Sequence, residues 1–346
     1  MSRMMSRRKE EGKKLREELF NLVILRIEKI KPIVTSKQSS FGEGTSTMNR
    51  NFILLLFLVF YHFSFAQNAP VVIPGTKFSM VPPEGFVLST NFSGFQSNET
   101  GSSIVVADFP ASYAELVKGF TKEALKTKGM ELIAKEEVTY QQKQATLYKV
   151  TQQANGMMYH KLILLFGDLK NTVMVNGIYP ELFNSQEKAI RASLFSIKAD
   201  EKQIANPLEA SPYAIDVSGT SYVFVKSLAG SLLYTEDGKM PTKKGMIIVG
   251  NSLGNRIYTD EKEHAIERLK KLPNASKAVI QKIEKINISN MEGYEIVAQG
   301  DNGQLLYEVM LFTPDRKYYL IVGEANENKT KNLEVFQKVA RSFRVK

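Results

Sequence analysis

The sequence predicts an α+β protein made of two tandem copies of one domain, each an antiparallel sheet packed with helices. Residues 284–346 can be laid over residues 136–198 without a gap, at a constant offset of 148. The shared positions are mostly apolar or aromatic, as at Tyr159 and Tyr307 or Phe195 and Phe343, so a core has been kept. Each copy also runs from strands into a final helix, which indicates a helix layered on a sheet.

The repeated stretch is expected to form hairpins followed by a helix. Asn155-Gly156 and Asn302-Gly303 favour tight turns, because Asn-Gly tolerates the positive φ that such turns need. Thr330 is placed to cap the last helix, whose apolar residues fall at helical spacing on one face. The expected strands are 144–152, 157–166 and 172–179 in the first copy, and 294–299, 305–312 and 318–324 in the second.

The first copy is expected to begin with strands at 77–81 and 103–108. Ser112 and Glu115 have the spacing of a capping box, which predicts that a helix begins there. Leu116 and Phe120 would share one face of that helix, and Gly129 would end it with a left-handed cap. The corresponding helix of the second copy is expected at 260–272.

The polar stretch 201–211 is the predicted linker between the two domains, because Asn206-Pro207 interrupts regular structure there. The first domain then covers residues 70–200 and the second covers residues 212–346. Each is long enough to fold alone.

Residues 48–66 have the pattern of a secretory signal peptide. A short basic start is followed by the apolar run 52–60, and Ser64 and Ala66 supply the small residues at positions −3 and −1. Cleavage is expected before Gln67, which places the protein in a secreted or periplasmic location with no integral membrane span in the mature chain. Residues 1–47 are then an extension of the gene model or a disordered tail. The alternative is a cytoplasmic amphipathic tail on a membrane anchor.

Charge and cysteine content exclude several classes of function. The formal charge is +10, but residues 1–66 contribute +6 of it, so the part expected to fold is close to neutral. Nucleic-acid binding needs basic groups gathered on one face, and it is not predicted. The chain has no cysteine, which rules out disulfides, thiolate catalysis and cysteine metal sites.

No catalytic residue, metal ligand or cofactor site is predicted. His160 lies mid-strand at the position that the offset of 148 matches to Glu308, and both are expected on the solvent face of a strand. His264 has no second histidine one turn away and is expected to be exposed. Asp168 and Asp315 recur in the two copies, which indicates either two turns stabilised by aspartate or two equivalent binding sites.

The candidate binding residues are Arg316 and Tyr319, at the start of the strand expected at 318–324. Alternation along this strand would bury one of Tyr318 and Tyr319 and expose the other beside Arg316 and Lys317. Tyrosine and arginine are enriched at protein interfaces, so this strand end is the predicted contact with a partner protein.

The residues 77–86, KFSMVPPEGF, resemble the opening strand and the Pro-x-Gly-aromatic turn of the PsbP-like superfamily, which includes the bacterial envelope protein DcrB. The endings 193–195 and 341–343 add to the resemblance. The second copy lacks this turn and has 218–220, SGT, in its place. The resemblance implies a PsbP-like α/β/α sandwich in each copy. It also implies that the protein binds or assists other proteins.

The sequence therefore favours a non-enzymatic accessory or binding protein of the bacterial envelope, with another envelope protein as its partner. Two alternatives stay open. One is a hydrolase with an acidic site between the two domains. The other is a membrane-tethered interaction protein, if residues 1–66 are kept.

Overall fold

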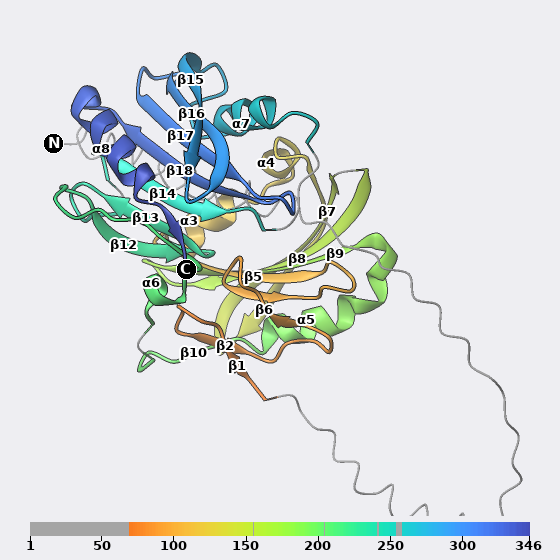
Figure 1. Cartoon of the computed structure of the whole chain (residues 1–346). Helices are drawn as coiled ribbons and strands as arrows, with labels where there is room; N and C mark the ends of the chain where they lie inside the picture. The colour runs from red at the N-terminus through yellow and green to blue at the C-terminus, as the bar shows by residue number, and fades with distance from the viewer. Residues whose placement is uncertain (1–68, 155, 204, 241, 254–257) are drawn as a thin grey trace, which may run out of the picture.

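The computed structural model describes residues 69–346, except residues 155, 204, 241 and 254–257. The predicted signal peptide, its cleavage site and residues 1–47 lie outside the described residues. The described chain forms two seven-stranded antiparallel sheets, one from each copy of the repeat (Figure 1).

The strand order of the first sheet places its last strand, β9, at the centre beside β5. Across the sheet the strands are β3 (Val87–Leu88), β4 (Gly94–Gln96), β5 (Ser103–Phe109), β9 (Thr172–Pro180), β8 (Met157–Gly167), β7 (Lys143–Ala154) and β6 (Met130–Tyr140). The helices of this domain are α3 (Tyr113–Lys118), α4 (Lys122–Lys126), the 3₁₀ helix η1 (Glu181–Gln186) and α5 (Glu187–Phe195).

The second sheet repeats that order strand for strand. Its strands are β12 (Val223–Leu228), β13 (Ser231–Thr235), β14 (Met246–Asn251), β18 (Tyr318–Ala325), β17 (Leu305–Phe312), β16 (Met291–Gln299) and β15 (Val279–Ile288). Helix α7 (Glu261–Lys270) stands where α3 and α4 stand in the first copy, and α8 (Lys329–Arg341) stands where α5 does. The predicted duplication of the whole domain is thus confirmed.

Short strands complete each domain beside its final helix. In the first domain they are β1 (Val71–Val72), β2 (Phe78–Met80) and β10 (Lys198–Ala199), and in the second β11 (Tyr213–Ala214) and β19 (Arg344–Val345). The predicted linker, residues 201–211, includes the short helix α6 (Pro207–Ala210), whose N-terminus is capped by the side chain of Asn206.

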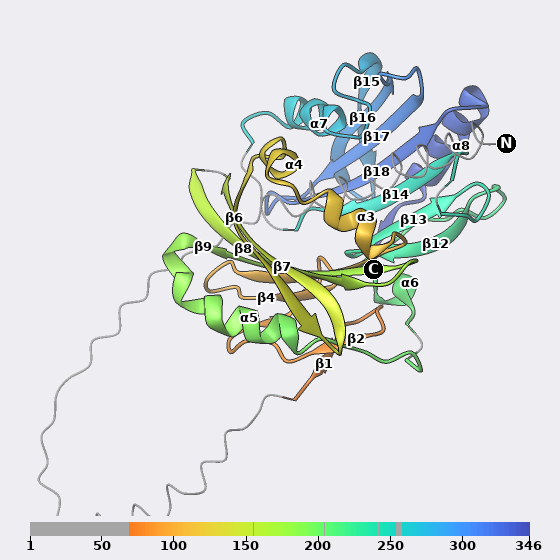
Figure 2. The same ribbon diagram turned by 180° about the vertical axis from the view of Figure 1, so that it is seen from behind.

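Each sheet carries helices on both faces, which confirms the predicted α+β sandwich. Ile190 and Leu194 of α5 lie in a buried cluster with one face of the first sheet, and Phe336 and Val339 of α8 do the same in the second domain. Figure 2 shows α3 and α4 on the opposite side of the first sheet from α5, toward the second domain. The sandwich in each copy follows from alternation, because successive strand residues point to opposite faces.

A third buried cluster includes side chains from both domains. It lies on the faces that carry α3, α4 and α7, and it runs from Phe92 and Phe109 in the first domain to Leu228 and Leu320 in the second. The two sheets therefore share apolar packing in addition to their own cores.

The constant offset of 148 holds for only part of the repeat. The hairpin β6–β7 and the hairpin β15–β16 carry the same bulge, at Ile133 and at Gln281, which are 148 residues apart. Farther on, Gly177 and Gly323 are equivalent because each lies directly beneath the final helix of its domain, and they are 146 residues apart. The turns between these strands differ in length, so the offset changes.

This change of offset overturns the expectation for Glu308. Leu162 pairs with Gly177 as Tyr307 pairs with Gly323, so Glu308 is equivalent to Ile163 and not to His160. Glu308 is fully buried, whereas a solvent-facing position was predicted. Apolar residues recur along every strand. An alignment based on them therefore does not detect that the two copies have shifted by two or three positions relative to each other.

Two helix details also differ from the prediction. The helix expected from Ser112 to Gly129 is divided into α3 and α4. Gly119 is the C-cap of α3, and Thr121 is the N-cap of α4. Helix α8 begins two residues earlier than its predicted cap, Thr330, implies. Its N-cap is Asn328 in the left-handed conformation, without a side-chain cap bond.

Phe120, at the break between α3 and α4, should be critical to the stability of the first domain. Its ring is 2% exposed and stacks on Tyr148, with 4.8 Å between centroids. Replacing Phe120 with Ala should lower the free energy of unfolding by about 3–5 kcal/mol, because the cavity cannot close between two sheets. Chemical denaturation measures this, and a loss below about 1 kcal/mol would contradict the packing described.

Candidate functional site

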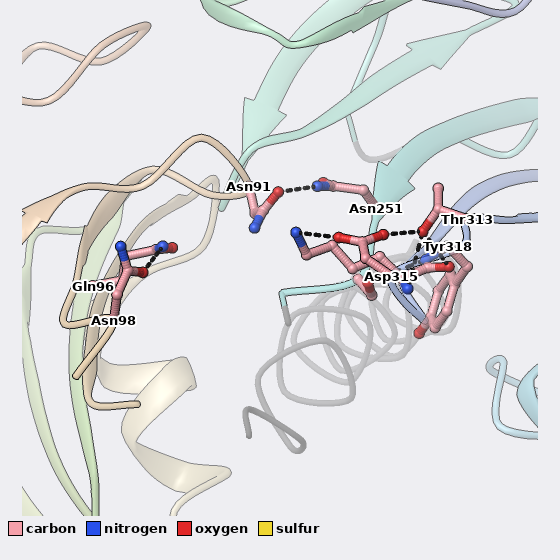
Figure 3. Close-up of polar contacts among 9 residues, drawn as sticks. Asn91, Gln96, Asn98, Asn251, Thr313, Asp315 and Tyr318 are labelled. Carbon is pink, nitrogen blue, oxygen red and sulfur yellow. Dashed lines mark hydrogen bonds and ion pairs between the residues drawn. The ribbon is translucent and has the colours of Figure 1, made fainter. Parts of the chain in front are cut away.

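The turn between β17 and β18, residues 313–317, is fixed by its own side chains. The Thr313 hydroxyl lies 2.6 Å from Oδ1 of Asp315, and the backbone N–H of Lys317 donates to that hydroxyl at 3.0 Å. Asp315 and Lys317 form an ion pair at 2.8 Å (Figure 3). Arg316 has a positive φ of 58°. The turn therefore places Arg316 at its tip, with its backbone in the left-handed region.

The equivalent turn of the first domain is built on Asp168. Its Oδ1 accepts hydrogen bonds from the backbone N–H groups of Lys170 and Asn171, at 2.7 and 2.9 Å. Leu169 stands at the tip and is exposed. Of the two alternatives for the recurring aspartates, the structure shows the turns. Asp168 acts through backbone N–H groups, whereas Asp315 acts through the side chains of Thr313 and Lys317.

Four aromatic rings gather beside the Arg316 turn, on the face of the second sheet that carries α7. His264 of α7 lies between Tyr258, at 5.1 Å between centroids, and Tyr318, at 5.6 Å. Phe312 completes the group at 5.3 Å from Tyr258. Tyr258 and His264 are half-buried, whereas Phe312 and Tyr318 are buried. We call these four residues the aromatic cluster.

Arg316 lies close enough to the aromatic cluster for its charge to act on it. Burial raises the pKa of Tyr258, and the positive charge of Arg316 opposes that shift. The Arg316 residue is exposed, and among the described residues its guanidinium has no hydrogen bond or ion pair. The turn thus presents an unpaired cation beside a half-buried tyrosine.

Tyr319 lies on the other face of the sheet. It packs against Phe343, at 5.1 Å between centroids, and Tyr213, at 5.9 Å, so it is half-buried beneath the C-terminal strand. Burial raises the pKa of Tyr319. The structure therefore separates the two candidate residues: Arg316 stands by the aromatic cluster, and Tyr319 supports the same strand from behind.

The histidines are placed differently from the prediction. His264 is half-buried within the aromatic cluster, so the expectation that it is exposed is wrong. His160 is also half-buried and stacks on Tyr179, with 5.5 Å between centroids. Tyr179 in turn donates to Glu187 at 2.7 Å, on the face covered by α5.

The two domains meet along a seam near the Arg316 turn. The side-chain amide of Asn251 donates to Oδ1 of Asn91 at 3.1 Å (Figure 3). The β12–β13 turn comes so close to the first domain that a Cβ added to Gly230 would lie 3.0 Å from Cα of Phe92. A hollow of about 40 Å³ opens at this seam, lined by residues of the segments 89–93 and 207–212.

A lysine and an aspartate also meet across the seam. Nζ of Lys226 donates to the backbone carbonyl of Asp108 at 2.6 Å, where β5 extends past its short neighbour β4. Burial raises the pKa of Asp108 and lowers that of Lys226, and each charge opposes the shift of the other. The arrangement joins the open edge of one sheet to the other domain.

Sequence reasoning missed Tyr258, His264 and Phe312 as neighbours of Arg316. The described residues contain no group of three acidic or histidine side chains placed to hold a metal ion. Within the same ranges, no helix is long and apolar enough to cross a membrane. The apolar run at 52–60 lies outside them.

The chain has a tandem α+β fold, with two antiparallel sheets that each carry helices on both faces. No protein family and no curated protein matches its sequence. Among similar solved structures is a cyanobacterial PsbP from Synechocystis sp. PCC 6803, with 10% identity and a TM-score of 0.30 over 40% of this chain and 96% of that one. The Tle4–Tli4 complex has 10% identity and a TM-score of 0.31, over 81% and 98% of the two chains. The T6SS immunity protein TplEi of Pseudomonas aeruginosa has 12% identity and a TM-score of 0.28, over 82% and 99%.

Proposed function

We propose that this protein is a secreted or periplasmic, non-enzymatic accessory or binding protein of the bacterial envelope, and that its partner is another envelope protein. The observation that carries the proposal is the position of Arg316. It is an exposed cation at the tip of a hydrogen-bonded turn, beside the aromatic cluster and close to the seam between the domains.

This arrangement suits recognition of a protein surface. A guanidinium binds carboxylates in a two-pronged geometry, and tyrosine supplies apolar area with a polar end. Because the bonds around Thr313 and Asp315 already fix the turn, binding sacrifices little conformational freedom there. The partner therefore offers an acidic side chain beside an apolar one. Tyr319 acts as a positioning residue, since it packs the strand against Phe343.

The location is supported by the sequence of residues 48–66, whose basic start, apolar run and small residues before Gln67 match a secretory signal peptide. The absence of cysteine is compatible with an oxidising compartment.

Replacing Arg316 with Ala should reduce capture of the partner by at least about tenfold, as is typical for an arginine at the centre of an interface. The protein from Gln67 onward would be immobilised and exposed to an envelope extract, and bound proteins identified by mass. The variant should keep the thermal unfolding of the wild type, because the Arg316 guanidinium makes no contact that holds the fold within the described ranges.

Lys170→Ala is the matched control, because Lys170 is an exposed cation on the equivalent turn of the first domain. A partner that is retained by the wild type and by Lys170→Ala but lost by Arg316→Ala supports the proposal. If the wild type and both variants retained the partner equally, Arg316 would not be part of the contact surface. A hydrolytic activity of the purified protein that is lost on replacing an acidic residue of the seam would support the enzyme alternative instead.

A further inference from the structure

Glu308 is a carboxyl group buried in the middle of a sheet. It lies on β17 between Ile296 of β16 and Val322 of β18, and it is 0% exposed. Its side chain shares the face of the sheet that α7 covers, with Leu306 and Met310 on either side along the strand. The two residues directly across from it and the two beside it along the strand are thus apolar.

The carboxyl group has no hydrogen-bond partner among the described residues. Neither carboxyl oxygen accepts a hydrogen bond. Nη1 of Arg268, a buried residue of α7, is also without a hydrogen-bond partner. Burial raises the pKa of Glu308 to about 8, and the charge of Arg268 opposes this only in part. A carboxyl group in such a place is neutral at neutral pH, because an unpaired charge costs several kcal/mol in an apolar interior.

A second glutamate shows how this sheet holds a charge when it is paired. Glu295 lies on the neighbouring strand β16 but on the opposite face, and it is 3% exposed. It accepts a hydrogen bond from Tyr307 at 2.7 Å and forms an ion pair with Arg341 of α8 at 3.0 Å. Glu308 has no such pair, although Arg268 of the helix above it carries the complementary charge.

Other titratable side chains on this face come from each of the three elements packed around Glu308, namely α7, β16 and β18. His264 is one turn before Arg268 on α7, within the aromatic cluster. Tyr294 belongs to β16, and Tyr318 and Glu324 belong to β18. Among the charged groups, Arg268 is the one that acts on the titration of Glu308.

We propose that Glu308 and Arg268 make the docking of helix α7 dependent on pH. With Glu308 protonated, α7 lies on the sheet through Ala265 and Leu269. When α7 lifts, water reaches Glu308, which releases its proton to solvent and can then pair with Arg268. A rise in pH therefore favours the lifted helix, because that state holds one proton fewer.

The direction and range of this effect follow from the two states of the carboxyl group. The pKa is raised while α7 is docked and has its ordinary value, near 4.5, when the helix is lifted. Docking is therefore strongest below about pH 4.5 and weakens by on the order of tenfold for each pH unit between there and pH 8. Since α7 also carries His264, its lifting would separate the aromatic cluster beside Arg316.

Hydrogen exchange of the free protein tests this proposal. Amide protection would be measured at pH 5.5 and pH 7.5 and corrected for the intrinsic exchange rates. We expect the amides of α7 to lose at least about tenfold in protection relative to those of α8 as the pH rises. In Glu308→Gln, which cannot ionise, the protection of α7 should be the same at both pH values.

Glu295→Gln is the matched control, because it neutralises the paired glutamate of the same sheet and should leave the pH dependence of α7 intact. Carboxyl NMR of the wild type gives an independent reading, with Glu308 titrating well above the other glutamates. The proposal is overturned if α7 protection in the wild type does not change with pH. It is also overturned if the change persists in Glu308→Gln.

Discussion

Residues 70–200 and residues 212–346, produced as separate chains, should associate with each other in solution. Each half holds a complete seven-stranded sheet with helices on both faces, and we propose that each folds as a unit. Each nevertheless loses part of the buried cluster that the halves share, from Phe92 to Leu320. Exposing this apolar surface costs about 25 cal/mol per Å², so the halves should bind one another and unfold at a lower temperature than the whole chain.

Size-exclusion chromatography of each half and of their mixture, followed by thermal unfolding, measures this. The expected result is a one-to-one complex whose unfolding temperature exceeds that of either half. Lys226→Ala in the second half should weaken the complex, because it removes the hydrogen bond to Asp108. Halves that stay separate at tens of micromolar and unfold like the intact chain would show that the shared cluster contributes nothing to stability.

The three strands of the repeated stretch in each copy could be predicted because alternation and turn chemistry are local. The hairpins around residues 155–156 and 302–303 and the central strands β9 and β18 agree with the sequence to within a few residues. The duplication could also be predicted from the sequence, because the two sheets keep apolar residues at matching positions on their buried faces. Even the bulges at Ile133 and Gln281 keep the predicted offset.

The prediction failed where a side chain's surroundings depend on residues distant in the sequence. The position of Glu308 was wrong because apolar matching cannot detect turns of different length, and only the pairing of Gly177 and Gly323 with their neighbours reveals the slip. The aromatic cluster was missed because it joins Tyr258 and His264 to a turn about fifty residues away. A tyrosine just before a predicted helix carries no local signal of such a contact.

The turns show why a recurring residue need not keep one role. Asp168 accepts backbone hydrogen bonds, whereas Asp315 pairs with Lys317 and Thr313, yet both fix the same turn of the repeat. An aspartate-stabilised turn is therefore kept in both copies, while its length and the residue at its tip differ. An exposed Leu169 in one copy and an exposed Arg316 in the other would let the two domains contact chemically different surfaces.

Glu308→Gln and Glu295→Gln should change the free energy of unfolding in opposite directions. At pH 7.5 ionisation of Glu308 stabilises the unfolded chain. It does not stabilise the folded chain, because the pKa of Glu308 in the folded protein is about 8. Gln removes that advantage, so Glu308→Gln should stabilise the protein by about 2–4 kcal/mol, since one pKa unit corresponds to about 1.4 kcal/mol. Glu295→Gln breaks the ion pair between a buried carboxylate and the half-exposed Arg341, and it should destabilise the protein by about 1–3 kcal/mol.

The pH dependence separates these two causes. The gain from Glu308→Gln should be almost absent at pH 4, where the unfolded chain also keeps the carboxyl group protonated, and should grow as the pH rises toward 8. Urea denaturation of the wild type and both variants at pH 4, 6 and 7.5 measures each effect. A destabilised Glu308→Gln at every pH would mean that the carboxyl group is bound in the folded protein. Its unpaired oxygens and its burial among apolar neighbours argue for the opposite result.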